Sequence, residues 1–168
     1  MIGVKRKTAP ISEQGYLMHA LRFGERDLKA NRAGYLSGLN TAALREKRTI
    51  NVAILTTAAV VALFAWTSSV TPDRLCLVIP VILIAGYNAW RTTLLTADLR
   101  AGVVEAIQGI VYLDVNKGRS TGYSLAIGDE KFAVGYDVFN AFKNRDPYTL
   151  YIAPYSRMLL AAEPLLDE

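Results

Sequence analysis

Few side chains in this chain could carry out chemistry. His19 is the only histidine among 168 residues, which excludes a histidine-based triad and a metal site with several histidines. It lies in the apolar stretch YLMHALRF, where a histidine is more often packed than catalytic. Cys76 is the only cysteine, lies in another apolar run and has no partner for a disulfide or a metal site, so we expect a small buried side chain there.

Acidic residues offer a second possibility, a site built on paired carboxylates. The candidates are Asp114, Asp129, Glu130 and Asp137. A hairpin turn at GDE explains Asp129 and Glu130, and Asp137 suits the start of a helix. The segment NKGRSTG (residues 116–122) lacks the spacing of a phosphate-binding loop, so a hairpin turn is the better interpretation. The sequence therefore predicts no catalytic, cofactor-binding or metal site, and no enzyme.

Tyrosines are the remaining candidates, for binding rather than catalysis. Six of the nine tyrosines follow residue 102. A tyrosine combines apolar area with a hydroxyl group, which suits a contact surface. The alternative is ordinary packing of aromatic residues in strands. We take Tyr112, Tyr123 and Tyr151 as the outward-facing residues that contact a partner.

Two apolar runs determine where such a surface would lie. Residues 50–70 (INVAILTTAAVVALFAWTSSV) are 21 uncharged positions, and a second run of 16, residues 75–90 (LCLVIPVILIAGYNAW), follows after four residues. About 20 helical residues cross a hydrocarbon core of about 30 Å, and the second run reaches that length if its helix begins at Pro72 and continues past Arg91. We predict a two-helix transmembrane hairpin with spans at about 50–70 and 72–93. A buried hairpin in a soluble domain would need covering amphipathic helices that the rest of the sequence does not offer.

The flanks of both runs match a membrane interface. Basic residues stop the two runs on the same side, and aromatic residues lie near the edges. The predicted interface anchors are Arg45, Lys47, Arg48, Trp66, Tyr87, Trp90 and Arg91. Because both basic flanks lie on one side, we expect a multi-pass protein of the plasma (inner) membrane with both termini in the cytoplasm. No signal-peptide pattern opens the chain, so no cleavable leader is expected.

Charge is distributed unevenly along the chain. Residues 1–49 carry ten basic and four acidic residues, whereas residues 91–168 carry eight and ten. A basic segment before an apolar run suits a lipid bilayer with anionic headgroups. The same segment contains acidic residues and no aromatic platform or nucleic-acid-binding module, so nucleic acid is not expected as a partner.

The pattern divides the chain into three parts. Residues 1–36 form a basic N-terminal segment, in which residues 16–23 are either a strand or a helical turn and a short helix stops at Gly34. Residues 37–102 form the hairpin, whose helices continue into a cytoplasmic helical stalk, with Ser37 as the N-cap of the first helix.

Residues 103–168 form a small cytoplasmic β domain. Period-two patterns predict about five strands. VVEAIQGIVYLDV is either one strand or a pair of strands with a bend at Gly109, and the others are GYSLAI, KFAV, YTLYIA and RMLLAA. YDVFNAFKN predicts one short helix, with Val138, Phe139 and Phe142 on one face. The expected fold class is membrane α + β, a hairpin with a stalk followed by a small five-stranded β-barrel or rolled sheet with one short helix.

Two segments resemble those of uncharacterised bacterial two-transmembrane-helix proteins with a small cytoplasmic C-terminal β domain. They are DLKANRAGYLS, before the first span, and DPYTLYIAPYSRMLLAAEPL, a strand, a Tyr-x-x-Pro-x-Ser turn and a second strand. The resemblance covers most of the chain and implies the two-span layout. It implies no activity, and no functional residue is taken from it.

Two functions are consistent with these features. The first is an integral membrane protein without catalytic activity, which acts as an accessory subunit or scaffold by binding a protein partner or a second copy through its β domain. The alternative is a membrane-anchored sensor whose β domain holds a small ligand. An exposed patch of tyrosine and arginine favours the first function, and an enclosed polar pocket favours the second.

Overall fold

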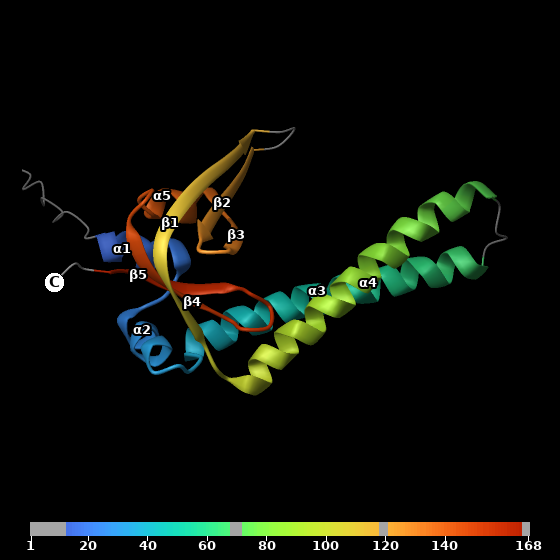
Figure 1. Cartoon of the computed structure of the whole chain (residues 1–168). Helices are drawn as coiled ribbons and strands as arrows, with labels where there is room; N and C mark the ends of the chain where they lie inside the picture. The colour runs from blue at the N-terminus through green and yellow to red at the C-terminus, as the bar shows by residue number, and fades with distance from the viewer. Residues whose placement is uncertain (1–12, 68–71, 118–120, 166–168) are drawn as a thin grey trace, which may run out of the picture.

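The computed structural model of the chain describes residues 13–67, 72–117 and 121–165. A helical hairpin projects from a unit that contains the strands (Figure 1). The helices are α1 (Glu13–Leu21), α2 (Glu25–Arg32), α3 (Gly38–Thr67), α4 (Pro72–Ala101) and α5 (Tyr136–Ala141). The strands are β1 (Glu105–Lys117), β2 (Thr121–Ile127), β3 (Glu130–Val134), β4 (Pro147–Ile152) and β5 (Leu159–Pro164).

Local sequence signals explain where the two hairpin helices begin and end. The Ser37 hydroxyl accepts the backbone N–H of Asn40 at 3.1 Å, which confirms Ser37 as the N-cap of α3. Pro72 is the first residue of α4, where its missing N–H costs nothing. Gly102 follows α4 with a φ of +63°, a left-handed conformation that glycine adopts readily and that ends the helix.

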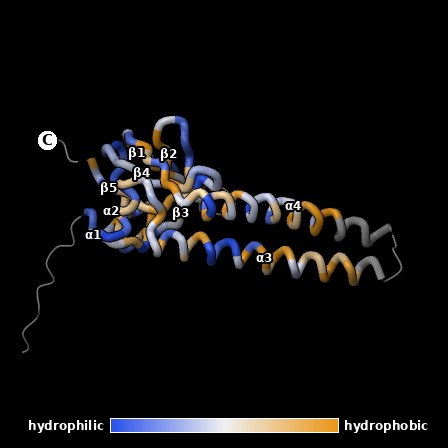
Figure 2. The backbone as a smooth tube through the Cα atoms, turned by 90° about the horizontal axis from the view of Figure 1, so that it is seen from below, coloured by the Kyte–Doolittle hydropathy of each residue, from blue (hydrophilic) through white to orange (hydrophobic). Residues whose placement is uncertain are grey.

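The hairpin exposes its apolar residues. Within the described residues, the segment Gly38–Phe64 of α3 is long and apolar enough to cross a membrane, and none of its most apolar window is buried in the protein. The side chains of Leu63, Phe64 and, on α4, Leu83 are 67%, 75% and 68% exposed. Figure 2 shows the apolar residues concentrated in the part of α3 and α4 that extends away from the sheet.

The five strands form one antiparallel sheet with the order β3-β2-β1-β4-β5. The central strand β1 pairs with β4 over its first half and with β2 over its second half. Near the change of partner lies Gly109, where an added Cβ would approach Cγ1 of Ile127 to 3.2 Å. Of the two alternatives for this segment, one continuous strand is confirmed and a pair of strands is wrong.

The predicted five strands and one short helix are confirmed, but of the two predicted arrangements, a β-barrel or a rolled sheet, the closed barrel is wrong because the sheet is open. Strands β3 and β5 are its two edges, and each pairs with a single neighbour. Helix α1 occupies the space that closure would need: Leu17 is completely buried in the same core as Val111, Leu125 and Leu150. The core is therefore closed by a helix that packs on the sheet, and the two edge strands do not pair with each other.

The stretch at residues 16–23, which the sequence left undecided, is helical up to Leu21. Leu17, Met18 and Leu21 recur at helical spacing and face the core, which an alternating strand could not achieve. Helix α2 ends at Arg32, and the predicted stop residue Gly34 follows two positions later with a left-handed φ of +81° and a hydrogen bond from Tyr35 N–H to the carbonyl of Ala30. The N-terminal helices therefore belong to the core of the strand-containing unit.

A smaller apolar cluster joins the hairpin to the sheet. Leu44 of α3 and Leu95 of α4 pack with Ala153 and Leu160, which flank the β4–β5 loop. Helix α5 ends at Ala141 and Phe142 is extended, so the expectation that Phe142 lies on a face of this helix is wrong. Its buried ring meets the ring of Tyr148 edge-on at 5.0 Å.

Candidate functional site

A cleft of about 510 Å³ lies where the hairpin meets the sheet. We call it the stalk–sheet cleft and define it by its polar lining residues. Lys47 comes from α3, Arg91 from α4, Lys131 from β3, and Ser156 and Arg157 from the β4–β5 loop. Because four separate elements contribute these side chains, the cleft exists only when the hairpin and the sheet are docked.

One buried carboxylate holds the loop side of the cleft in place. Asp98, which is fully buried on α4, accepts the backbone N–H groups of Tyr155 and Ser156, each at 2.9 Å. Each carboxylate oxygen takes one of the two donors. Two charge-assisted hydrogen bonds in a region away from water are stronger than neutral ones and fix the loop against the helix.

Arg157 holds the same loop from the sheet side. Its backbone adopts a left-handed φ of +53°, and its N–H donates to the carbonyl of Ala153 at 2.9 Å. This tight turn points the guanidinium between Glu130 and Glu105, and it lies 2.7 Å from the Glu105 carboxylate. The hydrogen bond to Glu130, followed by the charges of both acids, raises the pKa of Arg157.

The lining of the cleft is electrostatically unbalanced. Among the described residues it contains four basic side chains and no acidic one. Lys131 is paired with Asp114 at 3.0 Å, and Arg157 is paired with its two glutamates. Lys47 and Arg91 have no ion-pair partner within the described ranges. Two positive charges are therefore left without a neutralising partner at the hairpin wall.

Ser156 adds a neutral polar group to this wall. Its side chain is 5% exposed, and its hydroxyl oxygen makes no hydrogen bond within the described part of the chain. A buried hydroxyl without a partner is costly, by about 1–3 kcal/mol. The combination of two unpaired cations and one unsatisfied hydroxyl can accommodate an anion that has several oxygen atoms.

The carboxylates considered as candidates from the sequence lie in separate places. No group of three or more His, Cys, Asp or Glu side chains gathers within residues 13–67, 72–117 and 121–165. Of the four acids considered from the sequence, Asp114 pairs with Lys131 and Glu130 pairs with Arg157. Asp129 lies in the turn between β2 and β3, and Asp137 in the first turn of α5. The predicted structural roles of Asp129 and Asp137 are confirmed.

His19 and Cys76 have different outcomes. His19 is exposed on α1, so the expectation that it packs in the core is wrong. The apolar residues around it face the sheet, and the helical turn directs His19 to the other side. Cys76 lies in α4, and its side chain is outside the described residues, as is the turn at residues 118–120. The flanking residues Lys117 and Thr121 pair across β1 and β2, which confirms the predicted hairpin.

The three tyrosines chosen as a contact surface do not lie together. Tyr112 is 52% exposed on β1. Tyr123 is half-buried, with its ring 5.0 Å from that of Phe139. Tyr151 is only 3% exposed, so its expected outward orientation is wrong. Its hydroxyl donates to Glu163, and burial together with this hydrogen bond raises the pKa of Tyr151 to about 12.

Apart from Trp66, the predicted interface anchors lie along one level of the hairpin, between its apolar part and the sheet. Arg45 is exposed and Arg48 half-buried on α3, while Tyr87 and Trp90 are 58% and 60% exposed on α4 and contact each other edge-on. Lys47, Tyr87 and Arg91 line the stalk–sheet cleft. The side chain of Trp66 lies outside the described residues.

Sequence reasoning missed Asp98 and Ser156. Asp98 had a usable signal: it lies three residues after Leu95 and next to Leu99, on the face of α4 that packs on the sheet. A carboxylate on the buried face of a helix indicates a specific hydrogen-bond partner. Ser156 had no such signal, because a serine in a Pro-Tyr-Ser turn is common in any loop.

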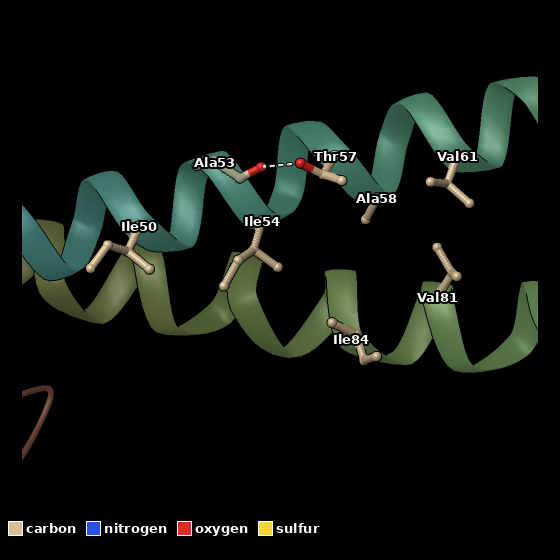
Figure 3. A pocket seen from close by; sticks show the side chains of 8 residues that line it. All are labelled: Ile50, Ala53, Ile54, Thr57, Ala58, Val61, Val81 and Ile84. Atoms are coloured by element: carbon tan, nitrogen blue, oxygen red, sulfur yellow. Dashed lines mark hydrogen bonds between the residues drawn. The ribbon is translucent and has the colours of Figure 1, made fainter.

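A second hollow lies between α3 and α4 themselves and is almost entirely apolar. Figure 3 shows it between Ile50, Ile54 and Val61 of α3 and Val81 and Ile84 of α4. Its one hydroxyl, on Thr57, donates to the carbonyl of Ala53 within the same helix. This groove offers packing surface and no polar chemistry.

Comparisons with known proteins give no match, whether to a family model, to a curated protein or to a solved structure. The resemblance to bacterial two-span proteins stays a prediction.

Proposed function

We propose that the protein is an integral membrane protein without catalytic activity, which acts as an accessory subunit or scaffold. Its α3–α4 hairpin crosses the bilayer twice and holds the strand-containing unit at the cytoplasmic surface. The observation that carries this proposal is the exposure of the hairpin's apolar side chains.

The energetic cost of this exposure favours a bilayer around the hairpin. Among the described side chains between residues 50 and 90, thirteen large apolar or aromatic ones are exposed. Burying a Val, Leu, Ile or Phe side chain fully contributes about 1.5–3 kcal/mol. Half of that for each residue adds up to the order of 10 kcal/mol, comparable to the whole stability of a domain. In water these side chains stay hydrated and this free energy is not gained. In a hydrocarbon core they are removed from water and it is gained.

Charge sets the proposed orientation. The apolar part of α3 is preceded by Arg45, Lys47 and Arg48, and the apolar part of α4 is followed by Arg91. The basic side chains of both helices therefore lie on the side of the hairpin that faces the sheet. Positive residues concentrate on the cytoplasmic side of membranes. We therefore propose a cytoplasmic location for the sheet and for both ends of the chain.

The outer face of β1 is the surface that supports a scaffold role. Ile110 and Tyr112 are two positions apart on this strand and are 48% and 52% exposed, so they present apolar area on one face of the sheet. Such a pair suits a contact with a protein partner or with a second copy. Tyr112 is retained from the predicted contact residues, and Ile110 takes the place of the buried Tyr151.

The alternative function, a membrane-anchored sensor of a small ligand, is supported by a different observation. The stalk–sheet cleft is polar, carries unpaired positive charge and exists only when the hairpin and the sheet are docked. A ligand bound there would bias the docking of the two parts.

Membrane fractionation tests the main proposal. Membranes that contain the full chain are washed with alkaline carbonate, and the protein is expected in the pellet. A C-terminal green fluorescent protein fusion is expected to fluoresce, because that reporter folds in the cytoplasm. Release of the protein into the wash would rule out the transmembrane hairpin, and a dark but intact fusion would rule out the orientation.

A further inference from the structure

We propose that the stalk–sheet cleft binds the phosphate group of an anionic membrane lipid, with Lys47, Arg91 and Ser156 as its ligands. This assignment rests on the proposed membrane topology and gives the cleft a specific occupant. It turns the general attraction of basic residues to lipid headgroups into one defined site.

The chemistry of the unpaired groups selects a phosphate. A lysine ammonium and an arginine guanidinium bind phosphate oxygens through charge-assisted hydrogen bonds. A serine hydroxyl can donate a third hydrogen bond, and the Ser156 hydroxyl is buried without a partner in the described part of the chain. The remaining cations of the cleft, Lys131 and Arg157, are already paired with acids and contribute less.

The position of the cleft selects a lipid as the source of the phosphate. Lys47 lies three residues before the uncharged run that begins at Ile50, and Arg91 directly follows Trp90, which is 60% exposed. Tyr87, one turn earlier on α4, also lines the cleft. In the proposed topology this level is the boundary of the hydrocarbon core, where lipid phosphates lie and where aromatic and basic residues gather. A lipid can therefore place its phosphate in the cleft while its acyl chains stay beside the apolar part of the hairpin.

Bound lipid would connect the parts that form the cleft. Lys47 and Arg91 belong to the two hairpin helices, whereas Ser156 belongs to the loop that Asp98 ties to α4. A ligand that contacts all three groups binds the docked state better than an undocked or unfolded one. It therefore stabilises the protein in proportion to its concentration over its dissociation constant.

Binding is tested on the full-length protein in a neutral maltoside detergent. The protein is titrated with dioctanoyl phosphatidylglycerol, and the melting temperature and the lipid adducts in native mass spectra are recorded. Dioctanoyl phosphatidylcholine tests the need for net negative charge, and inorganic phosphate tests a soluble source. We expect one saturable phosphatidylglycerol adduct and a rise in melting temperature, and much weaker responses to the other two compounds.

Two double variants separate the cleft from general surface charge. Lys47→Gln with Arg91→Gln removes the two unpaired cations and is expected to weaken the apparent affinity by at least about ten-fold. Arg45→Gln with Arg48→Gln removes the same charge from the same level but leaves the cleft lining intact, and should change it by less than about two-fold. Ser156→Ala should weaken binding by about five-fold without lowering the melting temperature of the lipid-free protein.

Three results would overturn the assignment: equal losses in the two double variants, equal binding of inorganic phosphate or phosphatidylcholine, or the absence of a saturable adduct. Membrane retention after the carbonate wash distinguishes this failure from failure of the proposed function. If the protein stays in the pellet but binds no phosphatidylglycerol, the proposed topology stands and the lipid site is contradicted. If the protein binds the lipid but is released by the wash, the lipid site stands and the transmembrane hairpin is contradicted.

Discussion

The carboxylate of Asp98 on α4 accepts the backbone N–H of Ser156 at 2.9 Å, although the two residues are 58 positions apart in the chain. Its second oxygen accepts the neighbouring N–H of Tyr155. Together with the apolar cluster around Leu95, this contact sets the orientation of the sheet relative to the hairpin. The positions of all residues in the stalk–sheet cleft depend on it.

Replacing Asp98 by Ala is expected to destabilise the protein strongly. Two backbone N–H groups lose their acceptors, and each buried unsatisfied group costs about 1–3 kcal/mol, so the expected loss is about 2–6 kcal/mol. At about 2–4 °C per kcal/mol for a chain of this size, the melting temperature should fall by at least about 4 °C. Asp98→Asn keeps one accepting oxygen but turns an amide donor toward the other N–H. Its melting temperature should lie between those of the unchanged protein and the Asp98→Ala variant.

Asp114→Ala is the matched control for this prediction. It also removes a carboxylate that contacts a partner, but both side chains of the Asp114–Lys131 pair are more than 60% exposed. An exposed pair contributes about 0–1 kcal/mol. Equal melting temperatures for the Asp98→Ala and Asp114→Ala variants would show that the buried contact does not hold the loop.

Acid is expected to weaken the packing of the N-terminal helices on the sheet. Glu13 of α1 accepts hydrogen bonds from Lys143 and then from Tyr148, and both lower its pKa. Burial raises the pKa of Glu163, but the hydrogen bonds from Arg32 and Tyr151 outweigh this and the net direction is downward. Both lowered pKa values mean that the folded state prefers the ionised carboxylates.

The sign of the pH dependence follows from these directions. A carboxylate with a lowered pKa stabilises the folded state fully above its unfolded pKa and loses that contribution as the pH falls through its folded pKa. The melting temperature should therefore decrease when the pH is lowered below about 5. The variant Glu13→Gln with Glu163→Gln cannot ionise at these positions, so its melting temperature should start lower at pH 7 and decline less between pH 7 and 3. Parallel profiles for both proteins would assign the acid sensitivity to other groups.

The sequence predicts the hairpin helices well because their boundaries are encoded locally. Ser37 supplies an N-cap hydroxyl, Pro72 suits a first helical position, and Gly102 adopts a left-handed conformation directly after α4. Each of these signals acts within one helical turn. Long-range information is not needed to read them.

The sheet was harder to predict because its packing depends on residues far away in the chain. Strand β4 is buried on both faces: Tyr148 contacts Glu13 of α1, and Tyr151 contacts Glu163 and through it Arg32 of α2. A strand covered on both sides has no alternation to reveal which face is exposed. The same N-terminal helices also explain why the sheet stays open. No local sequence pattern predicts that they pack on the sheet.

The aromatic contact behind α5 gives a third prediction. Phe142 is 5% exposed and packs edge-on against Tyr148, so Phe142→Ala leaves a cavity in the main core. Truncation of a buried phenylalanine costs about 3–5 kcal/mol. Tyr136→Ala, at a neighbouring aromatic residue that is 59% exposed, should cost much less. Thermal unfolding followed by near-ultraviolet circular dichroism measures both, and a small loss for Phe142→Ala would mean that the core refills the cavity.

The last prediction uses a charge to ask what surrounds the hairpin. Val60 is 61% exposed near the middle of the apolar part of α3, and Leu39 is 56% exposed at the base of the same helix. If water surrounds both, a lysine at either position has little effect on stability, because exposed positions tolerate charge. If the bilayer surrounds Val60 alone, Val60→Lys places a charge near the centre of the span, at a cost of about 3 kcal/mol.

We therefore expect Val60→Lys to lower the fraction of protein that alkaline carbonate leaves in the membrane pellet, and Leu39→Lys to leave that fraction unchanged. The two variants add the same charge to the same helix at nearly equal exposure, so they differ only in what lies around the side chain. Leu83→Lys on α4, which is 68% exposed, extends the test to the second proposed span. Retention of Leu83→Lys with loss of Val60→Lys would leave a single crossing by α3 and place α4 outside the hydrocarbon core. The proposed hairpin requires an apolar surrounding at both positions. Full retention of Val60→Lys and of Leu83→Lys in the pellet would therefore contradict it.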